Sequence, residues 1–472
     1  MKQNRFIYLF SGAVALLLIT LALVCNGTGD SGDSVLHYLY ARYAYSNTAN
    51  FFNSWAKPLY VLLGAPFAQL GFTGIKIFNI INTTLSMVCT YLIAKRLQLD
   101  NNWLIPVLLI LAPLHFALSL SGLTEPLFAC LLISGLCLLF YERTIAGLII
   151  LSFLPFARSE GMFLLIIIAL YLVRQKKYSS ILFLSAGQII YALAGYFHSG
   201  SLIWFYQTNP YSVISKYGSG ALNTYFINMP LIIGPASCVL LAAGFLSVPI
   251  KALQTKNKDA AQILLIWSLF TAYFFFHVIS WTLGLFSSLG LPRIIDGVCP
   301  LMIILCLYGF NQIITLTVKP SGRATVCNYA AALVIIINFA YILVKYNGHI
   351  GTAGFDLLPS TDELVENKMA DYIKQKFPDY KKRKIIYTAP YLSIPLNIDP
   401  TATGSEGSTA SNVLYIWDDW YSVVEGKTTF DMLKKDNDLV YDTTFNMYEK
   451  TGKEKTVALF RTKSSVLKKV VF

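Results

Sequence analysis

Long apolar runs recur through most of this chain, and they restrict what it can fold into more than any other feature. A helix needs about 20 mostly apolar residues to cross a bilayer, and runs of this kind recur from Phe6 to Lys345. Across the 472 residues, 55% of the side chains are hydrophobic and only 13% are charged, unlike an ordinary soluble globular protein. The sequence therefore predicts a polytopic α-helical membrane protein.

We expect about eleven spans, because the sequence contains about eleven separate apolar runs. The predicted spans are residues 6–25, 75–94, 103–121, 126–141, 145–156, 162–173, 179–197, 230–250, 261–283, 297–318 and 325–345. The fifth and sixth runs are too short to cross about 30 Å of hydrocarbon as plain helices. Residues 145–173 are therefore either two short spans or one re-entrant pair. The first run is followed by a poor signal-peptidase site, so it is expected to remain as an uncleaved span.

The basic residues predict the orientation of this membrane part. Residues 1–345 hold 20 lysines and arginines but only 8 acids, whereas residues 346–472 hold 17 of each. Placing the N-terminus in the cytoplasm puts 13 of those 20 on the cytoplasmic side, which the positive-inside rule favours. We expect a multi-pass protein of the cell inner (plasma) membrane with a periplasmic or extracellular C-terminal domain. Since the positive charge lies in short loops beside spans, nucleic acid is not an expected partner.

Residues 346–472 predict a small soluble α/β domain. A helical pattern runs from Thr361 to Phe377, and residues 399–412 are expected to form a loop. The strand patterns are residues 384–387, 413–417 and 456–460.

Acidic residues gather at the outer face in this orientation. The five are Asp30, Asp33, Glu125, Glu160 and Asp296, and they come from four separate loops. Considered by itself, Glu125 needs no functional explanation, because Thr124, Glu125 and Pro126 all suit the start of a helix. The shared face of the five acids nevertheless indicates a site at the outer leaflet.

Asp33 lies just after the first span and four residues before His37. If this segment is helical, the two side chains lie on one face. A carboxylate at this position could accept the proton of a hydroxyl nucleophile as a general base. The alternative interpretation is that Asp33 caps an interfacial helix by accepting N–H bonds.

Two arginines lie beside outer ends of predicted spans. Arg158 precedes Glu160, and Arg293 precedes Asp296 by about one turn. Guanidinium donors match phosphate oxygens, so both arginines are candidate phosphate ligands. The alternative for each is an ion pair with its neighbouring acid.

The histidines and cysteines show no metal-binding spacing. His115 lies in an apolar run and is interpreted as a core residue, whereas His277 lies in the outer half of the ninth span. The eight cysteines all precede the C-terminal domain and fall mostly in apolar runs, so no disulfide framework is indicated. The sequence requires no cofactor; a divalent metal stays open, because Asp33, Glu125 and Glu160 could meet in space.

Together these segments resemble the GT-C glycosyltransferases, polytopic enzymes that transfer sugars from polyprenyl-phosphate donors. That family has an acid in its first outer loop, matched here by Asp33 in Gly32-Asp33-Ser34. Residues 124–128 and 158–161 look like segments of its mannosyltransferase branch. Residues 291–300 are similar to an Arg-Tyr...Pro segment before a late span, with Ile294 in place of the tyrosine.

The resemblance implies a GT-C-like catalytic domain over residues 1–345 and an extracytoplasmic α/β domain over residues 346–472. It implies a hexosyltransferase that inverts the sugar if no covalent intermediate forms, with Asp33 as the catalytic base and Arg158 and Arg293 on the donor phosphate. The residues expected to bind substrate are His37, Arg42, Glu125, Glu160, His277 and Asp296. The expected partners are a polyprenyl-phosphate-linked sugar and the lipid bilayer, and the acceptor is a glycan, a lipid or a protein.

The alternative function is a polytopic transporter or lipid flippase, because such proteins often carry charged residues within the membrane. The acids gather at one face instead of the midplane, and no inverted repeat is evident. Both features favour the transferase.

Overall fold

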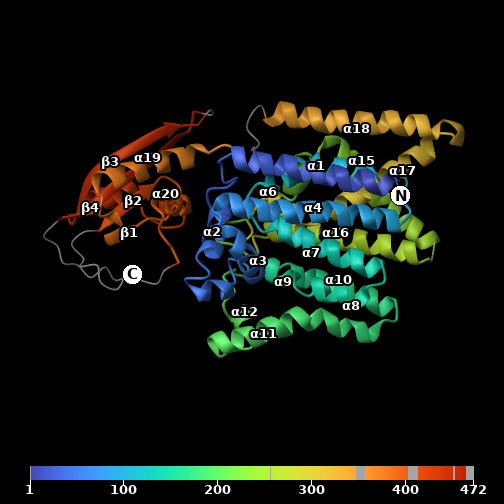
Figure 1. The fold of residues 1–472 in the computed structure, drawn as a ribbon, viewed down its shortest axis with the longest axis horizontal. Coiled ribbons are helices and arrows are strands. Elements are labelled where there is room, and N and C mark those ends of the chain that lie inside the picture. The colour runs from blue at the N-terminus through green and yellow to red at the C-terminus, as the bar shows by residue number, and fades with distance from the viewer. Residues whose placement is uncertain (1, 256, 347–356, 402–412, 450–451, 464–472) are drawn as a thin grey trace.

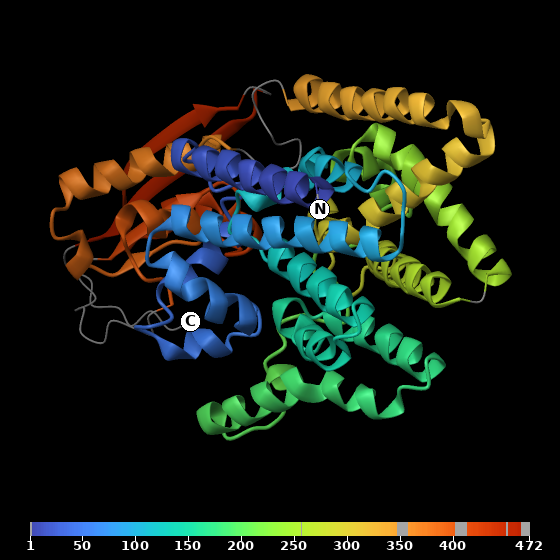
Figure 2. The ribbon, with the colours of Figure 1, turned by 45° about the vertical axis from the view of Figure 1, so that its right-hand side comes forward.

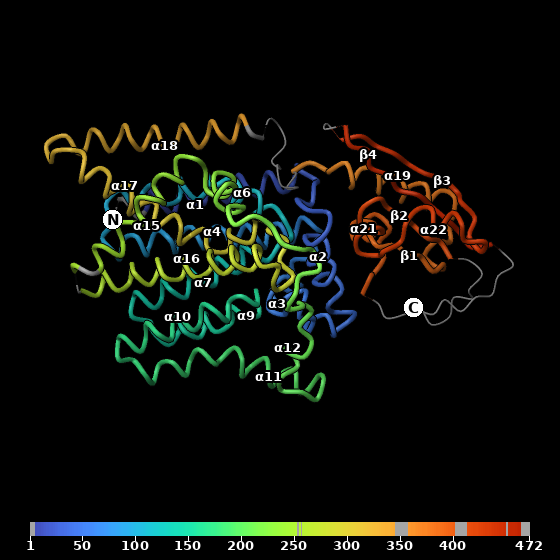
Figure 3. Tube along the Cα trace, turned by 180° about the vertical axis from the view of Figure 1, so that it is seen from behind, coloured from blue at the N-terminus to red at the C-terminus, as the bar shows by residue number. Residues whose placement is uncertain are grey.

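A helical part and a small sheet-containing part lie end to end along the long axis of the molecule (Figure 1). The structure is a computed structural model, and it describes residues 2–255, 257–346, 357–401, 413–449 and 452–463. The N-terminus of α1 (Lys2–Val24) lies at the end of the helical part that is remote from the sheet, as Figures 1 and 3 both show.

Seven helices in the described residues are long and apolar enough to cross a membrane. These stretches are Arg5–Val24, Phe72–Arg96, Tyr178–Ser199, Pro235–Ala252, Lys258–Thr282, Pro292–Thr317 and Pro320–Val344. They contain α1, α4 (Phe72–Arg96), η2 (Tyr178–Ser185) with α11 (Ala186–Ser199), α15 (Pro235–Gln254), α16 (Lys258–Thr282), η3 (Pro292–Val298) with α17 (Cys299–Thr317), and η4 (Pro320–Gly322) with α18 (Arg323–Tyr346). The predicted polytopic helical class is confirmed.

Shorter apolar helices complete the helical part. They are α3 (Pro58–Ala68), α7 (Glu125–Phe140), α8 (Thr144–Leu151) with α9 (Leu154–Ala157), and α10 (Gly161–Arg174). Residues 145–173 thus form two helical pieces, and the turn between them carries Arg158 and Glu160. In Figures 1 and 2, α11 lies at one edge of the helical part and α18 at the opposite edge.

The prediction of one continuous span over residues 103–121 is wrong. The segment forms two short helices, α5 (Leu104–Ile110) and α6 (Pro113–Ser119). Pro113 begins the second helix, because proline has no N–H for the preceding turn and its ring clashes with the carbonyl four residues back. The break ends the first helix and starts α6, which carries His115.

The helices of the membrane part pack closely. Gly244 of α15 lies against the Leu305 carbonyl of α17, and Gly309 of α17 lies against the Leu240 carbonyl of α15. A Cβ atom at either glycine would collide with that backbone. Small residues at a helix contact let the two backbones approach closely and increase their van der Waals contact. This contact matters in a membrane, because no hydrophobic driving force brings helices together in lipid.

The segment between α1 and α4 is largely helical. It contains α2 (Asp33–Arg42), η1 (Thr48–Phe52) and α3. The segment between α11 and α15 holds α12 (Trp204–Gln207), α13 (Thr224–Ile227) and α14 (Met229–Ile233). Asp33 and His37 therefore lie one turn apart on α2, as their spacing suggests.

The C-terminal domain has a four-stranded sheet in the order β1-β2-β4-β3, with β1 parallel to β2 and the other pairs antiparallel. Its strands are β1 (Ile385–Ile386), β2 (Leu414–Asp418), β3 (Leu439–Tyr448) and β4 (Glu454–Thr462), and its other elements are α19 (Thr361–Lys376), η5 (Tyr380–Lys382), η6 (Pro390–Leu392), α20 (Ser393–Leu396), α21 (Tyr421–Val424) and α22 (Phe430–Lys435). Apolar residues of α19 pack against β2 and β4. The predicted helix and three strands are present, whereas β3 was not predicted, and residues 402–412 of the predicted loop lie outside the described residues.

Candidate functional site

Arg293 joins two acids of the segment that follows α1. It lies on η3, and its Nη1 is 2.6 Å from Oδ2 of Asp30 while its Nη2 contacts Oδ2 of Asp33. Asp33 is the first residue of α2, and the N-cap residue is Gly32, without a side-chain cap bond. The capping alternative for Asp33 is therefore not what the structure shows. Its carboxylate still suits the positive end of the helix dipole.

Arg158 joins two other acids. Its Nη1 is 2.8 Å from Oε1 of Glu125, and its Nη2 is 3.1 Å from Oε1 of Glu160. It also donates from Nη1 to the hydroxyl of Thr124 at 3.2 Å. Because these partners come from the start of α7 and from the turn before α10, Arg158 fixes the two helix ends to each other.

Glu125 connects the two arginines into one network. Nε of Arg293 is 3.9 Å from the same Glu125 oxygen that binds Arg158. At the other end, Nε2 of His277 on α16 lies 3.7 Å from Oε1 of Glu160. A continuous line of charged groups therefore runs from α2 to the turn before α10 and ends at the imidazole of His277 on α16, and it includes four of the five acids predicted to share a face. Removing either arginine would leave its buried carboxylate partners without their cation, which is costly, whereas each arginine keeps a second carboxylate when one acid is removed.

Lys57 is a cation that sequence reasoning missed as a site residue. It is 4% exposed and directly precedes α3, with φ at +65°. Its Nζ is 2.7 Å from the Tyr211 hydroxyl and 3.5 Å from Ser159 Oγ. No carboxylate of the described residues lies within ion-pair distance of it. The sequence feature that could have indicated a buried cation is the position of Lys57 directly before Pro58, at the start of an apolar helix.

The pKa values of Asp30 and Asp33 diverge. Burial raises the pKa of Asp30 above its ordinary value, and Arg293 only partly offsets this. Burial also opposes ionisation of Asp33, but the charge and the hydrogen bond of Arg293, together with other positive groups nearby, outweigh it and lower the pKa of that carboxyl. Asp33 is therefore ionised at neutral pH, and its side chain is 42% exposed. A charged, accessible carboxylate of this kind can accept a proton.

The pKa values of His37 and Glu160 are both low. Burial, reinforced by the charge of Lys57, lowers the pKa of His37 to about 3 despite the opposing charge of Asp33, so its imidazole is neutral near pH 7. Its Nδ1 lies 3.2 Å from the Ala56 carbonyl, and a carbonyl can only accept, so Nδ1 carries the proton and Nε2 is free to accept. Burial opposes ionisation of Glu160, but chiefly the charge of Arg158 lowers its pKa to about 2.

Three predicted substrate residues lie outside this network: His37, which contacts Ala56 and Trp55, and also Arg42 and Asp296. Arg42 donates to the backbone carbonyl of Gln69 at 2.6 Å, at the far end of α2. Asp296 is fully buried and is paired with His115, not with Arg293 as the sequence spacing suggested. The 3-10 helix directs Arg293 and Asp296 to different partners, which come from segments far away in the chain. His115 is thus a core residue, as expected, but a hydrogen-bond partner of Asp296 as well.

A cavity of about 330 Å³ is lined by residues of η1, of the turn that follows it and of the segment around α12, and none of its lining residues belongs to the charge network. Aromatic rings of Phe52, Trp55 and Trp204 form its walls together with small polar side chains. Trp55 also stacks on His37, with ring centroids 4.8 Å apart. One indole therefore forms a wall of the cavity and supports the helix that carries Asp33.

The C-terminal domain contacts the segment that follows α1. Glu363 belongs to the capping box of α19, in which its Oε2 accepts the Ser360 N–H at 2.7 Å. Its Oε1 also accepts the Thr28 N–H at 3.0 Å. The Tyr421 hydroxyl lies 3.5 Å from Ser31 Oγ. These bonds place the domain directly over the segment that holds Asp30 and Asp33.

The helical part and the sheet domain together have a fold that solved membrane-protein structures share, so the predicted fold class is confirmed. The structure of ArnT from Cupriavidus metallidurans bound to undecaprenyl phosphate matches with a TM-score of 0.61, 11% sequence identity, and coverage of 97% of this chain and 98% of that one. The apo structure of the same protein matches with a TM-score of 0.64, 10% identity and the same coverage. No protein-family model and no curated protein matches the sequence. At this identity the likeness establishes the fold, and function is argued from the site.

Proposed function

We propose that this chain is a membrane glycosyltransferase that moves a sugar from a polyprenyl-phosphate donor to an acceptor hydroxyl at the outer face of the membrane. The ArnT structure of the same fold contains undecaprenyl phosphate, which supports this class of donor. The charge network supports a site for an anionic group that leaves during the reaction. The N-terminus and the C-terminal domain lie at opposite ends of the helical part, in accord with a site outside the cytoplasm.

Lys57 is the observation that carries the proposal. Burying an ammonium group costs free energy unless an opposite charge or several hydrogen bonds compensate it. Lys57 is buried, and its described partners are two hydroxyl groups and the ring of Tyr211, over which Nζ lies 4.5 Å from the centroid, so no carboxylate balances its charge. A phosphate beside Nζ would supply the missing negative charge through charge-assisted hydrogen bonds. Ser159 ties this position to the turn that holds Arg158.

Arg158 and Arg293 complete the proposed phosphate site. Each guanidinium has two carboxylate partners in the structure, so each can give up one contact to a phosphate and keep the other. Glu125 lies between them, 1% exposed, and serves to hold the arginines instead of contacting a sugar. Fixed cations in a site with little water stabilise the charge that grows on the leaving phosphate.

Asp33 is the proposed base. The acceptor oxygen attacks the anomeric carbon, the bond from that carbon to the phosphate oxygen breaks, and the hydroxyl proton passes to Asp33. When Arg293 turns to the donor phosphate, Asp33 loses part of the positive charge that lowers its pKa, so it becomes a better base as the donor binds. A single displacement of this kind inverts the sugar.

The aromatic cavity beside Trp55 is proposed to hold a substrate. His37, neutral and with a free Nε2 acceptor, and His277, beside Glu160, are placed to orient hydroxyl groups. Arg42 and Asp296 are proposed to have structural roles instead, because Arg42 donates to Gln69 and Asp296 pairs with His115, both away from the charge network.

The test is binding of undecaprenyl phosphate to the purified chain in nanodiscs, with the neutral alcohol undecaprenol as the ligand control. Loss of one charge-assisted bond costs about 1.5–3 kcal/mol, so Lys57→Gln should weaken binding by roughly tenfold to a hundredfold. Arg158→Lys and Arg293→Lys should weaken it too, because lysine lacks the planar fork. Lys216→Gln is the matched control, since Lys216 is exposed and paired with Glu425. Equal binding of phosphate and alcohol, or unchanged affinity in Lys57→Gln, would contradict the proposal.

A further inference from the structure

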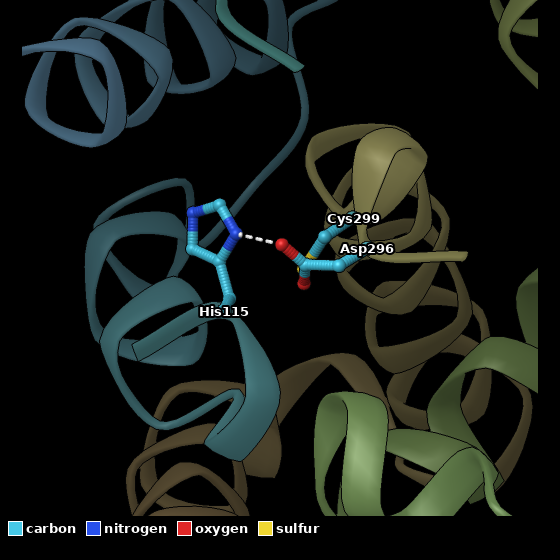
Figure 4. A group of neighbouring side chains, drawn as sticks. All are labelled: His115, Asp296 and Cys299. Carbon is cyan, nitrogen blue, oxygen red and sulfur yellow. Dashed lines mark hydrogen bonds and ion pairs between the residues drawn. The ribbon is translucent and has the colours of Figure 1, made fainter. Parts of the chain in front are cut away.

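Three side chains meet inside the helical part in a second polar group. His115 comes from α6, Asp296 from η3, and Cys299 is the first residue of α17 (Figure 4). Nδ1 of His115 is 2.9 Å from Oδ2 of Asp296. One nitrogen, one oxygen and one sulfur atom of the three residues lie within 4.8 Å of one another. In Figure 4 all three side chains point toward one another across the space between their helices.

Burying these three side chains without a further ligand costs desolvation free energy. Asp296 and Cys299 are fully buried and His115 is 2% exposed. The second carboxylate oxygen of Asp296 has no hydrogen-bond partner among the described residues. A buried carboxylate oxygen without a partner carries a large desolvation penalty. The His115 contact satisfies only one side of the carboxylate, and the thiol of Cys299 is a weak donor.

We propose that His115, Asp296 and Cys299 bind one divalent transition-metal ion of the zinc class. Imidazole nitrogen, carboxylate oxygen and thiolate sulfur are the donor types that zinc accepts, whereas magnesium and calcium take oxygen ligands. A neutral imidazole, a carboxylate, a thiolate and a divalent ion sum to zero charge. A neutral complex is the form that a water-poor interior tolerates best. Three protein donors leave a fourth position of a tetrahedral ion for another ligand.

The ion would fasten α6 to the junction of η3 and α17. Asp296 and Cys299 are three residues apart at that junction, and His115 lies 181 positions away in the sequence. Arg293 lies on the same short 3-10 helix as Asp296. The metal therefore holds the segment that presents Arg293 to Asp33, and its role is structural positioning, independent of the proposed sugar chemistry.

The first test is the metal content of the full chain, purified in detergent with a tag that lacks histidine and measured by inductively coupled plasma mass spectrometry. We expect about one zinc per chain, as in other single-ion sites. Cys299→Ser and His115→Gln should lose most of it. Cys306→Ser is the control, because Cys306 is equally buried on α17 but belongs to no such group among the described residues.

The second test is made on the wild-type chain, so it does not depend on whether the Cys299 or His115 variants fold. Replacing the ion with Co²⁺ in the wild-type chain should give a thiolate-to-cobalt charge-transfer absorption in the near ultraviolet, and Cys306→Ser should keep it. A chain without stoichiometric metal that also gives no such band would overturn the proposal. Metal content that is unchanged in Cys299→Ser would overturn it equally, and the group would then be a metal-free ion pair.

Discussion

Replacing Asp33 with asparagine separates the proposed base from the surrounding ion pairs. The new side chain keeps the size of the old one but cannot take a proton from an acceptor. Arg293 is not left without a partner, because Asp30 stays 2.6 Å from its Nη1. The Asp33 side chain is 42% exposed, so loss of its own pairing should cost at most about 1 kcal/mol of folding free energy. Loss of a general base slows the chemical step by about 10² to 10⁴-fold.

The assay is single-turnover sugar transfer in detergent, with a thermal melt of the same sample. Asp30→Asn is the matched control, because it makes the same chemical change at the other carboxylate of Arg293. We expect Asp33→Asn to bind donor and melt near the wild-type temperature while transfer falls by at least a hundredfold, the lower bound for a lost base, to roughly 1%. Asp30→Asn should transfer within about tenfold of the wild type, because it keeps the base. Near-normal transfer by a folded Asp33→Asn, or an equal loss in both variants, would refute the assignment.

Two further predictions concern stability and topology. Glu160 has a pKa lowered to about 2 from an ordinary 4.5. By linkage its ionisation adds up to about 3 kcal/mol to the free energy of unfolding, which is fully present above pH 4.5 and is lost as the pH falls toward 2. Glu160→Gln should therefore lower the melting temperature at pH 7 and remove this acid sensitivity. The control is Glu142→Gln in the exposed pair with Lys258, which should change neither the melting temperature nor its pH dependence measurably. Equal melting temperatures of both variants would contradict the account of Arg158 and Glu160. A reporter that is active only in the cytoplasm should stay silent when fused after Phe472, and activity there would place the charge network on the cytoplasmic side.

The helices could be predicted because their signal is local. Apolar runs of about 20 residues suffice to indicate a span, and the Ser-Thr-Asp start of α19 became a capping box. The strand β3 (Leu439–Tyr448) was missed, because its burial does not alternate cleanly along the strand. The break at Pro113 was present in the sequence, but the apolar character of both flanks obscured it.

The site was only partly predictable, because its pairings are long-range. Spacing could place Asp33, Glu125 and Glu160 at one face and suggest two cations. It could not show that Arg293 binds Asp30 and Asp33, some 260 positions away, instead of its neighbour Asp296. Such partners depend on how helices pack, and packing is not visible in a short window of sequence.

The most direct test of the central claim is sugar transfer by the purified chain, reconstituted in proteoliposomes with a panel of polyprenyl-phosphate sugars and candidate acceptors. The account predicts that one donor is consumed, that free polyprenyl phosphate appears in step with the glycosylated acceptor, and that both products vanish in Asp33→Asn. Movement of an intact donor between leaflets, with no cleavage of its sugar, would contradict the account and identify a flippase instead.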